Sequence, residues 1–157
     1  MKMEALTKAM KTSISDVLET MFFLPIDFAE GADPGTFFPS DRGGILSARL
    51  DFSGPLSGCL LFHIPETLAT SMTASFMGQE AEGVSREHVG DTVKEILNMV
   101  AGNAFGMYDN EAVFDLGIPE IIRRGDIEGH GRQAGEEIFV GINTLEESLA
   151  FHLICRI

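Results

Sequence analysis

Residues 91–106, DTVKEILNMVAGNAFG, have the apolar spacing of a long amphipathic helix. Apolar side chains recur at every third or fourth position, and at about 100° per residue they fall on one face. Ser85 can cap the N-terminus, so the pattern predicts a helix over residues 85–108 that Gly90 could divide in two. The predicted buried face consists of Val93, Leu97, Val100 and Ala104, flanked by Ile96 and Ala101.

The opposite side of this predicted helix carries a narrow polar strip. Asp91, Glu95, Asn98 and Gly102 fall within an arc of about 60°. Most helices have a solvated polar face, so spacing alone does not distinguish a site from ordinary surface. A glycine inside a helix lowers the stability of the helix by about 1 kcal/mol relative to alanine. Close approach of another backbone would explain why position 102 is nevertheless a glycine.

On the N-terminal side of this helix, the sequence predicts a helix, a loop and a hairpin. Residues 3–22 have helical spacing, and Pro25 prevents continuation. Residues 29–43 are rich in glycine and proline, which predicts a loop. The remaining predicted elements are a hairpin of residues 44–52 and 56–64, a helix from Pro65-Glu66 to Gly78, an acidic linker over 79–83, short extended segments at 113–116 and 120–123, a loop over 124–136, and strands at 137–143 and 148–157.

The order of these elements is a weak internal duplication: helix, loop, hairpin and helix, followed by helix, loop and hairpin. It predicts an α+β domain in which helices cover one side of an antiparallel sheet. The 157 residues are enough for one compact domain with a substantial core. We therefore expect a single domain over residues 1–157.

Composition excludes several classes of function. A net charge of −13 disfavours nucleic acid and anionic membrane surfaces, because both are bound through lysine and arginine. No apolar run approaches the 18 or more residues of a membrane span, and the N-terminus lacks the apolar segment of a signal peptide. We expect a cytoplasmic protein, with Cys59 and Cys155 as buried reduced thiols in strands.

The polar strip resembles the active-site signature of the CheC/CheX/FliY family of response-regulator phosphatases. In that family an Asp or Ser precedes Glu-x-x-Asn by four residues and a Gly-Asn-Ala run commonly follows, which here corresponds to Asp91, Glu95, Asn98 and residues 102–104. The resemblance extends to Leu116-Gly-Ile-Pro119 and to the layout of the 44–64 hairpin, and it covers the whole chain. It implies a CheC-like fold.

The resemblance also implies a reaction, hydrolysis of the phosphorylated aspartate of a CheY-type receiver domain. A carboxamide is neither a useful base nor a nucleophile, but it can donate to and accept from one water, so Asn98 would orient the attacking water. Glu95 would dock the receiver by pairing with a lysine of its active site. Mg²⁺ would be held by the receiver, so the chain needs no cofactor or metal of its own. Asp91 and Gly102 would contact the partner, although Asp91 could simply favour the helix N-terminus electrostatically.

The number of sites indicates a subgroup of the family. Members resembling CheC carry two Glu-x-x-Asn helices. Here the first helix offers Ser15 and Glu19 at the matching places, but Phe22 stands where the Asn would be. A single site resembles CheX, whose members tend to form homodimers, and the resemblance implies a homodimer here.

Other candidates are weaker. The four histidines share no ligand-like spacing, and His63 and His152 lie in strand-like runs, which favours structural roles. The run 129–132, Gly-His-Gly-Arg, is too short for a phosphate loop, and the Ser53–Ser57 turn is followed by a strand rather than the helix of a nucleophile elbow. The pair Phe37-Phe38, which lies in a predicted loop, is a minor candidate for a contact with a partner or within a dimer.

Two hypotheses follow. The first is a phosphatase that resets two-component, chemotaxis-type signalling. The second is a non-catalytic receiver-binding or scaffold protein of the same fold, which would have no need of Asn98. A metal-dependent or small-molecule hydrolase has no supporting set of residues.

Overall fold

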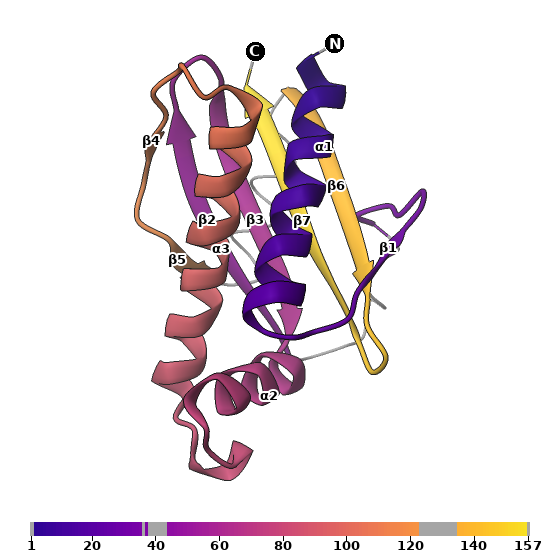
Figure 1. The fold of residues 1–157 in the computed structure, drawn as a ribbon, viewed down its shortest axis with the longest axis vertical. Coiled ribbons are helices and arrows are strands. Elements are labelled where there is room, and N and C mark those ends of the chain that lie inside the picture. Colours follow the sequence, from indigo (N-terminus) through magenta and orange to yellow (C-terminus); the bar gives the residue numbers. More distant parts are fainter. Residues whose placement is uncertain (1, 36, 38–43, 123–134, 157) are drawn as a thin grey trace.

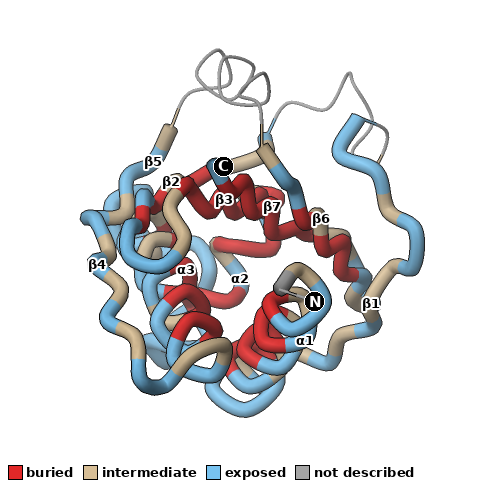
Figure 2. The backbone as a smooth tube through the Cα atoms, turned by 90° about the horizontal axis from the view of Figure 1, so that it is seen from above, coloured by how far each residue is buried: buried red, intermediate tan, exposed pale blue. Residues whose placement is uncertain are grey.

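The structure, a computed structural model, describes residues 2–35, 37, 44–122 and 135–156. In this part of the chain, three α-helices lie on one face of an antiparallel sheet (Figures 1 and 2). The helices are α1 (Lys2–Ser15), which continues as the π-helix η1 (Asp16–Met21), α2 (Glu66–Met77), the 3-10 helix η2 (Ala81–Gly83) and α3 (Arg86–Tyr108). The strands are β1 (Asp27–Ala29), β2 (Ile45–Ser53), β3 (Ser57–Pro65), β4 (Asp115–Leu116), β5 (Glu120–Ile122), β6 (Gly135–Asn143) and β7 (Ser148–Arg156).

Two long hairpins form the centre of the sheet. The strand order is β1-β6-β7-β3-β2-β4, with β5 also pairing with β2. The hairpins β2–β3 and β6–β7 meet where β3 pairs with β7, and there Phe62 lies opposite Phe151. Both side chains are fully buried, and their rings stack with centroids 4.3 Å apart. This aromatic pair therefore lies where the two halves of the sheet join.

The predicted duplication is visible in the topology, but the two halves interlock. The short strand β1 follows the first helix and pairs with β6 of the second hairpin. The short strands β4 and β5 follow α3 and pair with β2 of the first hairpin. Each half thus completes the edge of the other half, which makes one sheet of the two.

The core lies between the helices and the facing side of the sheet. From α1 and η1 it takes Leu6, Met10, Ile14, Val17 and Leu18, all fully buried. The helices α1 and α3 run antiparallel beside each other (Figure 1). They are joined by a buried hydrogen bond, in which the Ser13 hydroxyl donates to the Val100 carbonyl over 2.8 Å.

The sequence predictions were wrong in three details. The strand β1 was not predicted, because it is three residues long and its partner lies far along the chain, with Asp27 opposite Asn143. Helix α3 continues through Gly90 without a break. The helix predicted over residues 3–22 ends as the π-helix η1, whose hydrogen bonds run from i to i+5, and Met21 at its end is 44% exposed. Most of the predicted loop 124–136 lies outside the described residues, as do residues 129–132 and Phe38.

The other face of the sheet carries a polar row that crosses the four long strands and is buried on β2, β3 and β7 but exposed on β6. The Ser47 hydroxyl of β2 lies 2.7 Å from Nδ1 of His63 on β3, and Nε2 of His152 on β7 lies 3.2 Å from a carboxylate oxygen of Glu137 on β6. Burial, and secondarily the nearby His152, lowers the pKa of His63 from 6.5 to about 4. His63 is therefore neutral in the folded protein at pH 7, as the structural role predicted for it requires.

Stability should consequently depend on pH through His63. Between pH 6.5 and 4 the unfolded chain binds a proton at this side chain that the folded chain does not, so stability falls as the pH falls. The full shift corresponds to a loss of about 3 kcal/mol by pH 4. Denaturant unfolding of the wild type and of His63→Gln at pH 7 and pH 4 measures this loss. The variant should lose less stability on acidification, by about this amount, whereas the exposed-site control His88→Gln should match the wild type. Equal losses in the wild type and His63→Gln would show that folding does not lower the pKa of His63.

Candidate functional site

Helix α3 is held in place from its N-terminus onward. The Ser85 side chain accepts a hydrogen bond of 3.1 Å from the His88 backbone N–H, which confirms the predicted cap. Near the other end, the Phe105 ring packs against Phe52 of β2, with centroids 4.5 Å apart. The predicted buried face is confirmed: Val93, Ile96, Leu97, Val100, Ala101 and Ala104 are all at most 1% exposed.

The polar strip therefore points away from the core. Asp91, Glu95, Asn98 and Gly102 are all exposed. Within the described residues, the side chains of Glu95 and Asn98 make no hydrogen bond or ion pair. A carboxylate and a carboxamide one turn apart are thus presented on a convex surface, where both keep their full capacity to bind another molecule.

Asp91 differs from the other two polar residues of the strip, because it has a partner on its own helix. Lys94 Nζ lies 3.5 Å from Asp91 Oδ1, an i,i+3 pair whose side chains are 38% and 60% exposed. Such an exposed pair contributes little to stability. It does hold a positive charge beside the strip, a feature that the sequence analysis did not single out.

Gly102 leaves the C-terminal end of the strip without a side chain. A Cβ built at this position would meet no described atom within 4 Å. From the sequence we expected another backbone to lie close to Gly102. No such contact is made within the described residues.

The matching segment of the first helix differs in backbone as well as in sequence. The Ser15 hydroxyl donates to the Glu19 carboxylate, so these two side chains are bonded to each other. Phe22 is half-buried at the end of η1, and its ring lies 5.2 Å from that of Phe76. In place of an exposed carboxamide, this segment has an aromatic ring packed against α2.

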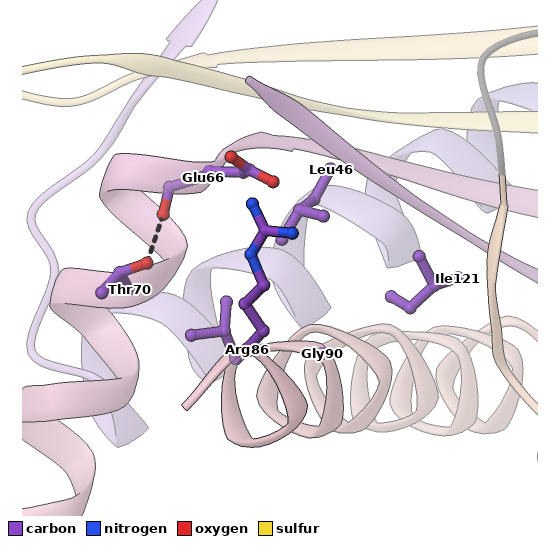
Figure 3. A pocket seen from close by; sticks show the side chains of 7 residues that line it. Leu46, Glu66, Thr70, Arg86, Gly90 and Ile121 are labelled. Carbon is purple, nitrogen blue, oxygen red and sulfur yellow. Dashed lines mark hydrogen bonds between the residues drawn. The ribbon is translucent and has the colours of Figure 1, made fainter. Parts of the chain in front are cut away.

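A cavity of about 220 Å³ lies near the start of α3, but none of the strip residues lines it (Figure 3). Figure 3 shows the Arg86 side chain pointing toward Glu66 within it. Its walls are Leu46, Glu66, Thr70, Arg86, Val89, Gly90 and Ile121. The strip and the cavity are therefore separate features of the surface.

Other side chains considered in the sequence analysis are packed within the fold. Cys59 and Cys155 are buried free thiols, as predicted, and burial raises the pKa of both, that of Cys155 to about 11. Phe37 packs edge-on against Phe139, with centroids 5.6 Å apart. Among the described residues, no three His, Cys, Asp or Glu side chains are grouped to hold a metal ion, and no helix is long and apolar enough to cross a membrane.

Comparisons with known proteins agree on one family. The sequence model described as "Chemotaxis phosphatase CheX" matches residues 46–143, more than half of the chain. No curated protein matches the sequence significantly.

Several solved structures share the fold. The chemotaxis protein CheX from Vibrio vulnificus is 22% identical, with a TM-score of 0.73 and coverage of 96% of each chain. A CheC-like protein from Shewanella oneidensis is 19% identical, with a TM-score of 0.73 over 97% of this chain and 98% of that one. The CheX–CheY–BeF₃–Mg²⁺ complex from Borrelia burgdorferi is 16% identical, with a TM-score of 0.70 over 96% and 97%. The predicted CheC-like α+β fold is thereby confirmed.

The open space at Gly102 predicts the effect of adding a side chain. Gly102→Ala should raise the free energy of unfolding by up to about 1 kcal/mol, because alanine has the higher helix propensity. Gly90→Ala is the matched variant on the same helix, since its Cβ would meet only Ile121 Cγ1, at an ordinary 3.8 Å. Denaturant unfolding measures both changes. A marked destabilisation by Gly102→Ala would contradict the open surroundings.

Proposed function

The chain belongs to the CheX family of chemotaxis phosphatases, and we propose that it hydrolyses the phosphorylated aspartate of a CheY-type receiver domain. The proposed site is the strip on α3. Asn98 orients the attacking water and Glu95 docks the receiver. Asp91 and Gly102 contact the bound receiver. The protein acts in the cytoplasm, in two-component signalling of the chemotaxis type.

One observation supports this proposal most strongly: the strip is exposed on a convex helix, away from the cavity. A small molecule is normally bound in a concave site that covers most of its surface. An exposed helix face whose polar residues do not line the cavity suits a macromolecular substrate that encloses the helix in a cleft of its own. A receiver domain with its phosphoaspartate in a cleft is such a substrate.

The chemistry asked of Asn98 is modest. Water attacks the phosphorus atom, the bond from phosphorus to the aspartate oxygen breaks, and inorganic phosphate and a free carboxylate result. The acyl phosphate already has a good leaving group, so no strong acid is required from α3. The Asn98 carboxamide can accept a hydrogen bond from the water and so hold its oxygen in line with the phosphorus. Catalysis is then mainly a matter of position.

Docking is assigned to Glu95. Its carboxylate has no partner among the described residues and carries one of the negative charges of a chain whose net charge is −13. A lysine of the receiver's active site would pair with it and fix the register of the two proteins. The Mg²⁺ of the reaction is bound by the receiver's acidic residues. The family resemblance also supports a homodimer, which we include in the proposal.

Removing the Asn98 carboxamide tests the catalytic role. Asn98→Ala should slow phosphate release from an acetyl-phosphate-labelled CheY-type receiver in Mg²⁺ by about 100-fold or more, because the water loses its orienting contact. Glu95→Ala should chiefly weaken receiver binding. Asn110→Ala, an exposed asparagine beyond the end of α3, is the control and should keep the wild-type rate.

The alternative is a receiver-binding protein without catalysis. It would be indicated by wild-type protein that binds the receiver but does not speed phosphate release. Unchanged turnover in Asn98→Ala would contradict the role given to this side chain, and unchanged affinity in Glu95→Ala would contradict the docking role.

A further inference from the structure

Four exposed apolar side chains gather where the end of η1 meets the end of α2. Phe23 is 83% exposed, Phe76 63%, Met21 44% and Met77 37%. The two segments are held together by the contact between the Phe22 and Phe76 rings, 5.2 Å apart. We name Met21, Phe23, Phe76 and Met77 the apolar corner. Exposed apolar side chains on adjoining segments mark a site of interaction more often than scattered single residues do.

Phe23 is the least expected member of the apolar corner. Its φ of +54° lies in the left-handed region, and it is the one such non-glycine residue in the described chain. A bulky residue there is an outlier and costs on the order of 1 kcal/mol or more, whereas Asn or Gly is tolerated. The core does not require the ring, because it is almost wholly exposed. A strained and exposed aromatic side chain therefore requires an explanation outside the fold.

The apolar corner is level with the half of α3 that carries Asp91 and Glu95. The two helices run antiparallel, and Ser13 is level with Val100 because of the hydrogen bond between them. Residues that follow Ser13 are therefore level with residues that precede Val100. Consistently, η1 and α2 both contact α3. A protein docked over Asp91 and Glu95 would have the apolar corner at its edge.

Charge around the apolar corner selects among possible occupants. Four exposed carboxylates lie within five residues of its members along the chain: Asp16, Glu19, Glu80 and Glu82. An anionic lipid surface would be repelled by them. A second copy of this chain would bring the same carboxylates to the contact, since a two-fold interface places like surfaces together. A partner that presents a basic group beside apolar ones fits, and the receiver lysine proposed to pair with Glu95 is such a group.

We propose that the apolar corner is a second contact for the receiver domain, adjoining the catalytic strip and adding affinity without taking part in the chemistry. This inference rests on the proposed function, because it assigns the apolar corner to the same receiver. Phe23 would be its main anchor, as an exposed aromatic ring that becomes covered on docking. The corner would then help to determine which receivers are bound.

Two variants from the two segments test the assignment. Phe23→Asn places a residue tolerant of left-handed φ at position 23, so folding is retained or improved. Met77→Gln introduces a good helix former at an exposed position of α2 and leaves the Phe22–Phe76 contact in place. Val113→Asn is the matched control, because Val113 is 79% exposed but lies beyond the opposite end of α3.

The measurement is the Kd for a CheY-type receiver loaded with beryllofluoride and Mg²⁺, together with the turnover rate at saturating phosphorylated receiver. Phe23→Asn and Met77→Gln should each raise Kd by about tenfold and leave saturated turnover close to that of the wild type, while Val113→Asn changes neither.

Each other outcome overturns the inference and can be told apart from a failure of the proposed function. If the wild type dephosphorylates the receiver and both variants bind it normally, the apolar corner is not a receiver contact, and the role of α3 stands. If the variants alter only self-association, seen by light scattering, the occupant is a second copy. If the wild type neither binds nor dephosphorylates any CheY-type receiver, both proposals are wrong.

Discussion

Burial of one face of α3 is the constraint on which the rest of this structure depends. Val93, Leu97 and Val100 are withdrawn completely from solvent between the sheet and α1. Because a helix turns about 100° per residue, this burial forces residues 91, 95, 98 and 102 outward together. The Ser13–Val100 hydrogen bond fixes the neighbouring helix at the same level. The proposed site therefore consists of the α3 side chains that face outward once the opposite face is buried. It lies on a helix packed against the core rather than on a loop.

The two interlocked halves of the sheet show why one site per chain is compatible with a duplicated fold. Each half completes the other's edge through β1, β4 and β5, and this pairing does not depend on the polar strip of either helix. The end of the first helix can therefore differ from α3 without affecting this pairing. It is π-helical at Asp16–Met21, and Phe22 packs against Phe76. Met21 and Phe23 are exposed in this same segment, so the segment that has Phe22 in place of the asparagine also contributes to the apolar corner.

Sequence reasoning reached most of the fold because the longest elements have strong local patterns. The two hairpins, the cap at Ser85 and the buried and exposed faces of α3 follow from periodicity, and the structure confirms them. Sequence reasoning did not find β1, because the strand that pairs with it lies more than a hundred residues away along the chain. It also missed the Asp91–Lys94 ion pair and the hydrogen bond from Ser13 to α3, because both depend on side-chain geometry. The roles of Asp91, Glu95, Asn98 and Gly102 came from resemblance and chemical argument, and they stay predictions, because a free chain cannot display a contact made to its partner.

The central claim concerns where a receiver binds and which atom it meets there. A crystal structure of this chain with a CheY-type receiver in beryllofluoride and Mg²⁺ tests it directly. The account predicts that α3 enters the receiver's active-site cleft, with the Asn98 carboxamide within about 3 Å of the beryllofluoride or of a water beside it and the Glu95 carboxylate paired with a receiver lysine. A receiver bound to another surface, with Asn98 still facing solvent, would contradict it.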